Sequence, residues 1–202
     1  MQTRLFILAA WAVVSCPLGA QNSKTLDLHT HRARKSYYVI LAARGGSATG
    51  HAFVLWGIED SIHRRTTLQA FGLYPDGSGT NCGSLVHNVP GGILDEMKNH
   101  SFQAITQELI VRVDEADFKR SWRVARQWDC RHQFSLGNRD CVEFLRAVGE
   151  SLNLNMPRGG ITRWTPQAYV RALLADTEKG SKPFLHTRGS EEQTSTLPVV
   201  FP

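Results

Sequence analysis

Residues 137–145 are Gly137-Asn138-Arg139-Asp140-Cys141-Val142-Glu143-Phe144-Leu145, and this stretch has the features of a helix start. Asp140 is a typical N-cap residue, and Glu143 completes a variant of the capping box with Asp in place of Ser or Thr. Cys141 is therefore expected to be the first residue of a helix. The spacing of the apolar residues predicts that one face of this helix is buried and carries Cys141, Leu145, Val148 and Leu152.

A thiol at the start of a helix has the properties of a nucleophile. The partial positive charge of a helix N-terminus favours the thiolate and lowers the pKa of a cysteine. Unsatisfied backbone N–H groups at the same end can stabilise an oxyanion. Far upstream, His51 begins an apolar run, and a distant Cys and His brought together by a fold are the minimum set for nucleophilic acyl chemistry. We therefore expect Cys141 to be the nucleophile and His51 the base.

Strands and helices are both indicated around these two residues. Apolar runs at 37–43, 51–56, 66–73 and 103–113 predict strands, and the polar stretch 59–65 predicts a turn that joins the second and third into an antiparallel hairpin. In the second strand, alternation puts His51, Phe53 and Leu55 on one face and Ala52, Val54 and Trp56 on the other. Helices are expected after Asp114, after Asp140 and from Thr165-Pro166 to Leu174. The chain is therefore predicted to be an α+β domain with an antiparallel sheet packed against the Cys-bearing helix.

A third polar group is needed to orient the imidazole of His51. In a hairpin with its turn near residues 61–64, Gln69 lies on the returning strand, close to the strand of His51. Its side-chain oxygen could accept a hydrogen bond from one imidazole N–H. His63 is the rival for this role, but it falls in the turn and is expected to face solvent. We therefore predict Gln69 as the third residue.

Three motifs occur along the chain in a characteristic order: Gly50-His51-Ala52-Phe53-Val54, then Leu68-Gln69-Ala70-Phe71-Gly72, then Asn138-Arg139-Asp140-Cys141-Val142-Glu143-Phe144. This order resembles permuted papain-like domains of the NlpC/P60 superfamily, over about residues 36–155. The resemblance implies Cys141 as nucleophile, His51 as base and Gln69 as the orienting residue. It implies hydrolysis or transfer at amide, thioester or ester carbonyls, with peptidoglycan peptides and lipid acyl groups among the known substrates. Two residues separate Asn138 from Cys141, which departs from the family pattern.

The N-terminal residues have the features of an export signal. Arg4 is followed by an apolar core from Leu5 to Val14, and Leu18-Gly19-Ala20 is a plausible cleavage site. The alternative is a lipoprotein signal anchored at Cys16. The predicted organisation is a signal peptide over 1–20, a polar lead-in over 21–35, the papain-like domain over 36–175 and a poorly ordered tail over 176–202. The protein is expected to be periplasmic or secreted.

Charge and cysteine content indicate which binding partners and which disulfide to expect. The formal net charge is +5, and it falls by one if Arg4 leaves with the signal. The basic residues are scattered and do not form a stripe interleaved with aromatics, so nucleic acid is not an expected partner. Peripheral contact with an anionic envelope is expected instead. An oxidising compartment favours a disulfide between Cys82 and Cys130, which would leave Cys141 free. Pairing of Cys141 with another cysteine is the alternative.

No cofactor or metal is expected. The ligand types in His29-Thr30-His31 and Cys130-Arg131-His132 lack the paired spacing of a structural zinc site. The leading hypothesis is an exported cysteine hydrolase that cleaves an amide bond in peptidoglycan peptide. The alternatives are a lipid acyl hydrolase or acyltransferase of the same fold, and a non-catalytic envelope-binding module in which Cys141 is disulfide-bonded.

Overall fold

The computed structural model describes residues 22–28, 36–45, 50–76, 88–98, 105–129, 133–158 and 165–178. The predicted signal peptide, the lipoprotein alternative at Cys16 and nearly all of the predicted tail lie outside these ranges. The predicted disulfide partners Cys82 and Cys130 also lie outside them. Within them no cysteine pair is present, and Cys141 is a free thiol.

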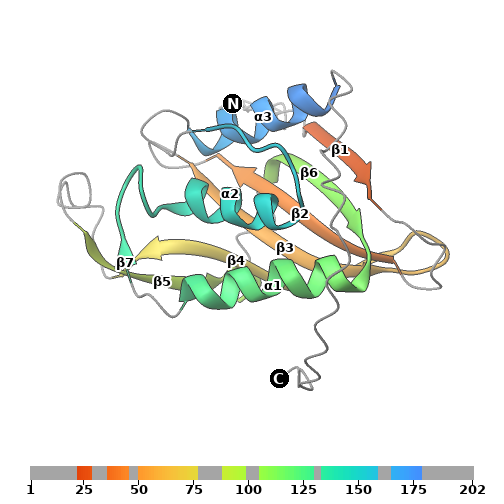
Figure 1. The fold of residues 1–202 in the computed structure, drawn as a ribbon, viewed down its shortest axis with the longest axis horizontal. Helices are drawn as coiled ribbons and strands as arrows, with labels where there is room; N and C mark the ends of the chain where they lie inside the picture. The colour runs from red at the N-terminus through yellow and green to blue at the C-terminus, as the bar shows by residue number, and fades with distance from the viewer. Residues whose placement is uncertain are drawn as a thin grey trace, which may run out of the picture.

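One seven-stranded sheet organises the described residues, in the order β1-β6-β2-β3-β4-β5-β7 (Figure 1). Its strands are β1 (Asn22–Asp27), β2 (Ser36–Arg44), β3 (His51–Glu59), β4 (Arg65–Pro75), β5 (Val89–Asp95), β6 (Ile105–Val113) and β7 (Gln133–Phe134). β1 pairs with β6 in parallel, and the other pairs are antiparallel. The α+β prediction is confirmed, with a mixed sheet in place of a purely antiparallel one.

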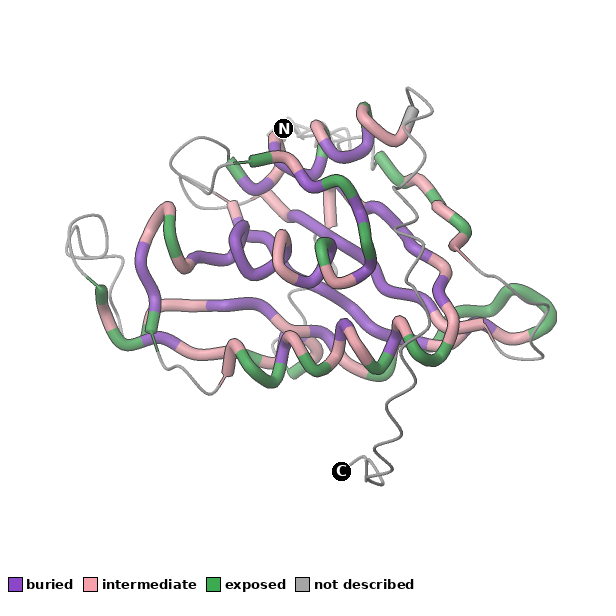
Figure 2. Tube along the Cα trace, in the orientation of Figure 1, coloured by how far each residue is buried: buried purple, intermediate pink, exposed green. Residues whose placement is uncertain are grey.

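The helices α1 (Glu115–Asp129), α2 (Cys141–Ser151) and α3 (Pro166–Glu178) cover one face of this sheet (Figure 1). We call it the helix-covered face. Its core joins strand residues such as Val54, Trp56 and Val111 to helix residues such as Leu145 and Val170. Figure 2 shows the buried stretches of β2, β3 and α2 lying together at the centre of the molecule.

The opposite face of the sheet has a second, smaller apolar cluster. It consists of Tyr38, Ile40, Ala42, Phe53, Leu55, Ala70 and Ile110. Met97 and Ile105, at the two ends of the connection from β5 to β6, pack against it. Side chains that alternate along β3 therefore enter two separate cores, and the assignment of a residue to one core or the other decides which groups it can meet.

The start of α2 follows its local sequence signals. Asp140 is the N-cap, and its carboxylate accepts hydrogen bonds from the backbone N–H groups of Val142 and Glu143. Cys141 is the first helical residue, as predicted. The side chain of Glu143 forms an ion pair with Arg146, one turn further along the helix.

Three strands were not expected, namely β1, β5 and the two-residue β7. The predicted polar lead-in contains β1, whose residues pair in parallel with β6 from Asn22↔Gln107 to Asp27↔Arg112. No strand was predicted at β5, because Pro90, Gly91 and Gly92 are typical of a loop, yet residues 91–95 pair with β4. α3 also continues to Glu178, past the predicted domain boundary at 175. None of the helices in the described ranges has both the length and the apolarity needed to cross a membrane.

Candidate active site

The structure does not bring the side chains of Cys141 and His51 together. Cys141 belongs to the core under the helices, where it packs with Ala52 and Val54. The imidazole of His51 stacks near the ring of Phe53, which belongs to the cluster on the opposite face. The predicted alternation along β3 is confirmed, and its consequence is that α2 covers the Ala52 side of the strand and not the His51 side.

The thiol of Cys141 is enclosed. The residue is 3% exposed, and burial raises its pKa to about 12. The backbone amides of Ala52, Cys141 and Val142 act in the opposite direction, and the nearby carboxylate of Asp140 adds to the increase. Exclusion of water from Cys141 therefore outweighs the stabilisation of a thiolate by the helix N-terminus, and the resting group is a neutral thiol.

The enclosed position of Cys141 leads to a testable prediction about its rate of alkylation. In the native protein, alkylation of Cys141 by iodoacetamide should be slow near neutral pH and should rise about tenfold per pH unit, because the thiolate fraction rises that way below the pKa. The rate can be followed by mass spectrometry of the tryptic peptide Asp140–Arg146. A rate that levels off near about pH 9 would reveal an ordinary cysteine pKa and contradict the enclosed thiol.

Gln69 does not reach His51. In the β3–β4 ladder Gln69 pairs with Trp56, five residues along the strand from His51 and on the helix-covered face. A bulge between Trp56 and Gly57 sets this register. His63 is in the turn with φ 60° and its side chain 78% exposed, 3.4 Å from the carboxylate of Glu59. The structure therefore supports neither predicted candidate as the group that orients His51.

His51 is instead held by Glu96, a residue that the sequence analysis did not select. Its Nε2 lies 3.1 Å from Oε1 of Glu96, whose side chain is fully buried. The ring N–H is not aimed along this line, so the contact is a close charge–dipole pair without a well-directed hydrogen bond. Only 11% of the His51 side chain is exposed.

Arg44 and Tyr74 complete a polar cluster around the Glu96 carboxylate. Arg44 donates from Nη1 to Oε2 of Glu96 over 2.9 Å and from Nη2 to the Tyr74 hydroxyl over 2.6 Å. The Tyr74 hydroxyl donates in turn to Oε1 of Glu96. The Tyr74 ring also stacks on the imidazole of His51, with 4.1 Å between ring centroids. We call Arg44, His51, Tyr74 and Glu96 the His51 cluster.

Gly72 makes room for this cluster. A Cβ atom added at Gly72 would lie 2.3 Å from Nε2 of His51 and 2.6 Å from Oε1 of Glu96. Both distances are shorter than any real contact of a methyl group. The absence of a side chain at Gly72 is therefore what lets the imidazole and the carboxylate meet above the backbone of β4.

The electrostatics of the cluster favour a neutral imidazole. Burial lowers the pKa of His51, and the Arg44 cation also lowers it, while Glu96 opposes the shift. Because a carboxylate oxygen repels a nitrogen lone pair, we assign the ring proton to Nε2, which leaves Nδ1 as an acceptor. Burial and the Glu96 carboxylate raise the pKa of Tyr74, so its hydroxyl stays a donor. A neutral imidazole paired with a carboxylate is the arrangement of a general base.

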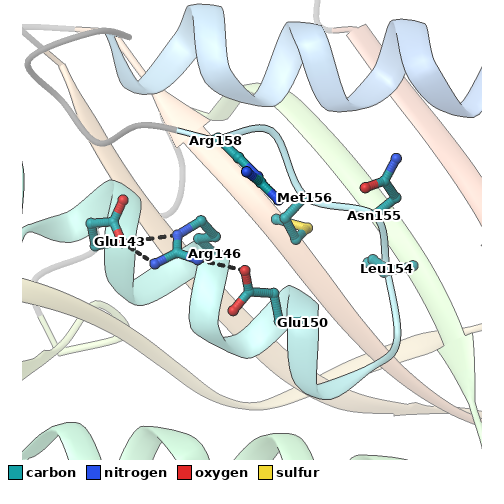
Figure 3. Close-up of a pocket in the computed structure, with 7 residues that line it drawn as sticks. All are labelled: Glu143, Arg146, Glu150, Leu154, Asn155, Met156 and Arg158. Atoms are coloured by element: carbon teal, nitrogen blue, oxygen red, sulfur yellow. Dashed lines mark hydrogen bonds and ion pairs between the residues drawn. The ribbon is translucent and has the colours of Figure 1, made fainter.

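A separate hollow of about 510 Å³ lies on the outer side of α2 (Figure 3). Glu143, Arg146 and Glu150 line it from the helix, and Leu154, Asn155, Met156 and Arg158 line it from the segment that follows. Arg146 bridges the two carboxylates of the helix. Ion pairs of this kind are ordinary on a solvated helix face, and the hollow contains neither His51 nor Cys141. We therefore assign the candidate site to the His51 cluster.

Comparison with known proteins adds no family to this geometry. No family model, curated protein or solved structure matches the chain. Within the ranges that the structure describes, no group of three or more His, Cys, Asp or Glu side chains could hold a metal ion. His29, His31, Cys130 and His132 lie outside those ranges. The chemistry of the site is therefore argued from its own residues.

Proposed function

We propose that this chain is a hydrolase of acyl bonds in which His51, held by Glu96, is the general base and Cys141 is the nucleophile. The observation that carries the proposal is the pairing of a buried imidazole with a buried carboxylate, 3.1 Å apart. Burial and the Arg44 cation lower the pKa of His51, so the ring is neutral and able to accept a proton near neutral pH.

The reaction would proceed in two acyl transfers. Nδ1 of His51 takes the thiol proton, and the sulfur of Cys141 adds to the carbonyl carbon. The proton then passes to the leaving amine as the C–N bond breaks, which leaves a thioester on Cys141. Water adds to the thioester, and its proton returns through His51 to the thiolate. The backbone N–H groups at the start of α2 are suited to bind the oxyanion in both steps.

This scheme has a definite conformational requirement. In the conformation described above, the thiol and the imidazole are on opposite sides of β3, although the thiol interacts with the backbone of Ala52, the residue after His51. The imidazole must therefore turn toward α2 for the proton transfer. Gly50, the residue before β3, has φ 73°, and a glycine backbone can adopt several conformations at this point.

Cell-wall peptide is the proposed substrate, and an export signal supports it. The apolar segment from Leu5 to Val14 after Arg4 is typical of proteins sent to the compartment that contains peptidoglycan. The resemblance of the His51 and Cys141 motifs to permuted papain-like domains supports the same reaction class. The α+β architecture, with a Cys-bearing helix packed on a sheet, is compatible with that fold.

Hydrolysis by matched histidine variants tests the proposal. Protein without residues 1–20 would be incubated with purified muropeptides and, separately, with phospholipid vesicles. His51→Gln should lower the rate on muropeptides roughly 10²- to 10⁴-fold, the usual contribution of a general base. His63→Gln replaces an exposed turn histidine and should leave the rate unchanged. Product would be measured by chromatography and mass spectrometry.

Cys141→Ala should abolish activity. Other outcomes would contradict the mechanism, the substrate or the role of His51. Activity that survives in Cys141→Ala but not in His51→Gln would show that His51 activates water directly. Direct activation of water by His51 is therefore the second candidate mechanism, and the separation of the imidazole from the thiol favours it. Product from vesicles alone would replace the wall substrate with a lipid acyl group. Equal losses in His51→Gln and His63→Gln would contradict the assignment of His51.

A further inference from the structure

We infer that Tyr74 is the positioning residue of the His51 cluster, because it contacts both the imidazole plane and the carboxylate oxygen that faces His51. Its ring stacks on His51 with 4.1 Å between centroids. Its hydroxyl donates to Oε1 of Glu96, the oxygen that lies 3.1 Å from Nε2. For catalysis the inference rests on the proposed role of His51 as base.

The position of Tyr74 follows from the β-ladder. Phe53 pairs with Gly72, so two residues further along β4 Tyr74 lies beside His51 on the same face of the sheet. Gly72 stands between them without a side chain, which lets the Tyr74 ring and the Glu96 carboxylate close over the imidazole. The imidazole is thus held by a stack on its plane and by a charge at its edge, and it would keep its orientation better than a histidine held by either alone.

The Tyr74 hydroxyl also weakens the interaction of the Glu96 carboxylate with His51. Among the described side chains, three meet this carboxylate: the Arg44 guanidinium at Oε2, and the Tyr74 hydroxyl and the imidazole at Oε1. A donor at Oε1 competes with His51 for the same oxygen. Removing the hydroxyl should leave more of the negative charge for the imidazole and favour its protonated form. Removing the carboxylate should have the opposite effect.

These opposite signs give a test that does not depend on turnover. The pH titration of the His51 ring proton would be followed by NMR, with its signal assigned from the spectrum of His51→Gln. Tyr74→Phe keeps the stack and should move the titration to higher pH, whereas Glu96→Gln should move it to lower pH. Arg44→Gln removes a cation that lowers the pKa of His51 and should therefore also move it upward. Thermal unfolding would confirm that each variant is folded.

Tyr38→Phe is the matched control. Tyr38 is a buried tyrosine on the same face of the sheet, and its hydroxyl is hydrogen-bonded to Thr67 Oγ1 at 3.0 Å, in a pairing that involves none of the four cluster residues. Loss of the Tyr38 hydroxyl should leave the pH titration of His51 unchanged.

In activity assays, Tyr74→Leu, which removes the stack as well, should lower kcat by up to about 100-fold with little change in KM, since misplacing a catalytic group has costs of that order.

The outcomes separate this inference from the proposed function. Coincident titrations of Tyr74→Phe and Tyr38→Phe would overturn the role of Tyr74, whether or not the protein is active. Shifts of the same sign in Tyr74→Phe and Glu96→Gln would also overturn it. The expected shifts in a protein that hydrolyses neither muropeptides nor vesicles would support the positioning of His51 by Tyr74 and refute the hydrolase.

Discussion

Replacing Trp56 with alanine is expected to lower the free energy of unfolding by about 3–5 kcal/mol, the usual cost of deleting a buried tryptophan. Trp56 is fully buried in β3. It packs edge-on against Trp122 of α1, with ring centroids 5.3 Å apart, and its Nε1 donates to Ser121 Oγ over 2.9 Å. The alanine variant would leave a cavity between the sheet and α1 and remove this hydrogen bond.

Urea unfolding followed by circular dichroism would measure the effect. Trp56→Phe is the control, because it keeps most of the ring and removes only part of the volume and the indole N–H. Ser121 Oγ retains its hydrogen bond to the Phe118 carbonyl in that variant, so no buried hydroxyl is left alone. The phenylalanine variant should therefore lose less than half of the stability lost with alanine. Equal losses would locate the effect in the indole N–H and not in packing.

Replacing Asp140 with alanine should cost about 2–4 kcal/mol, more than the loss of an ordinary N-cap. The carboxylate of Asp140 is fully buried and accepts three backbone hydrogen bonds, from Val142 at 2.9 Å, Glu143 at 3.0 Å and Gly137 at 2.6 Å. Alanine would leave these donors without their acceptor inside the protein. Urea unfolding measures the loss, and α2 should be the helix most weakened in hydrogen exchange.

Asp140→Asn separates the cap from the charge. Its side-chain oxygen can still accept from the helix start, so stability should fall less than in the alanine variant. The carboxylate of Asp140 contributes to the raised pKa of Cys141, and its neutralisation should therefore lower that pKa and speed alkylation of the thiol. Equal stability in the two variants would contradict capping as the source of the loss, and unchanged alkylation would contradict the electrostatic effect.

Local sequence signals predicted the helix that carries Cys141. An acidic N-cap, the position of the cysteine and the spacing of Leu145, Val148 and Leu152 all act within a few residues, and each was found as expected. The alternation of His51 and Ala52 along β3 was equally predictable. Which of the two faces would receive α2 was not, because that depends on the packing of segments about ninety residues apart.

The residues that contact His51 were not predicted, and for Tyr74 the reason is the strand register. Gln69 was chosen because it lies on the returning strand, but the ladder joins Phe53 to Gly72 and brings Tyr74 beside His51. Counting outward from the turn would have put Leu73 opposite His51, because the bulge between Trp56 and Gly57 shifts the pairing by one residue and no sequence signal revealed it. Glu96 was not predictable either, because it follows β5, whose first residues are typical of a loop, and it reaches His51 through the β4–β5 pairing.

The parallel strand β1 determines what the rim of the sheet presents to other molecules. β6 is strongly apolar, with Leu109, Ile110, Val111 and Val113 buried, and an uncovered strand of this kind is a template for pairing with another chain. β1 occupies that edge with a short, mostly polar segment whose side chains are exposed or half-exposed and include Lys24. Residues just after the predicted leader therefore replace the apolar edge of β6 with a mostly polar one.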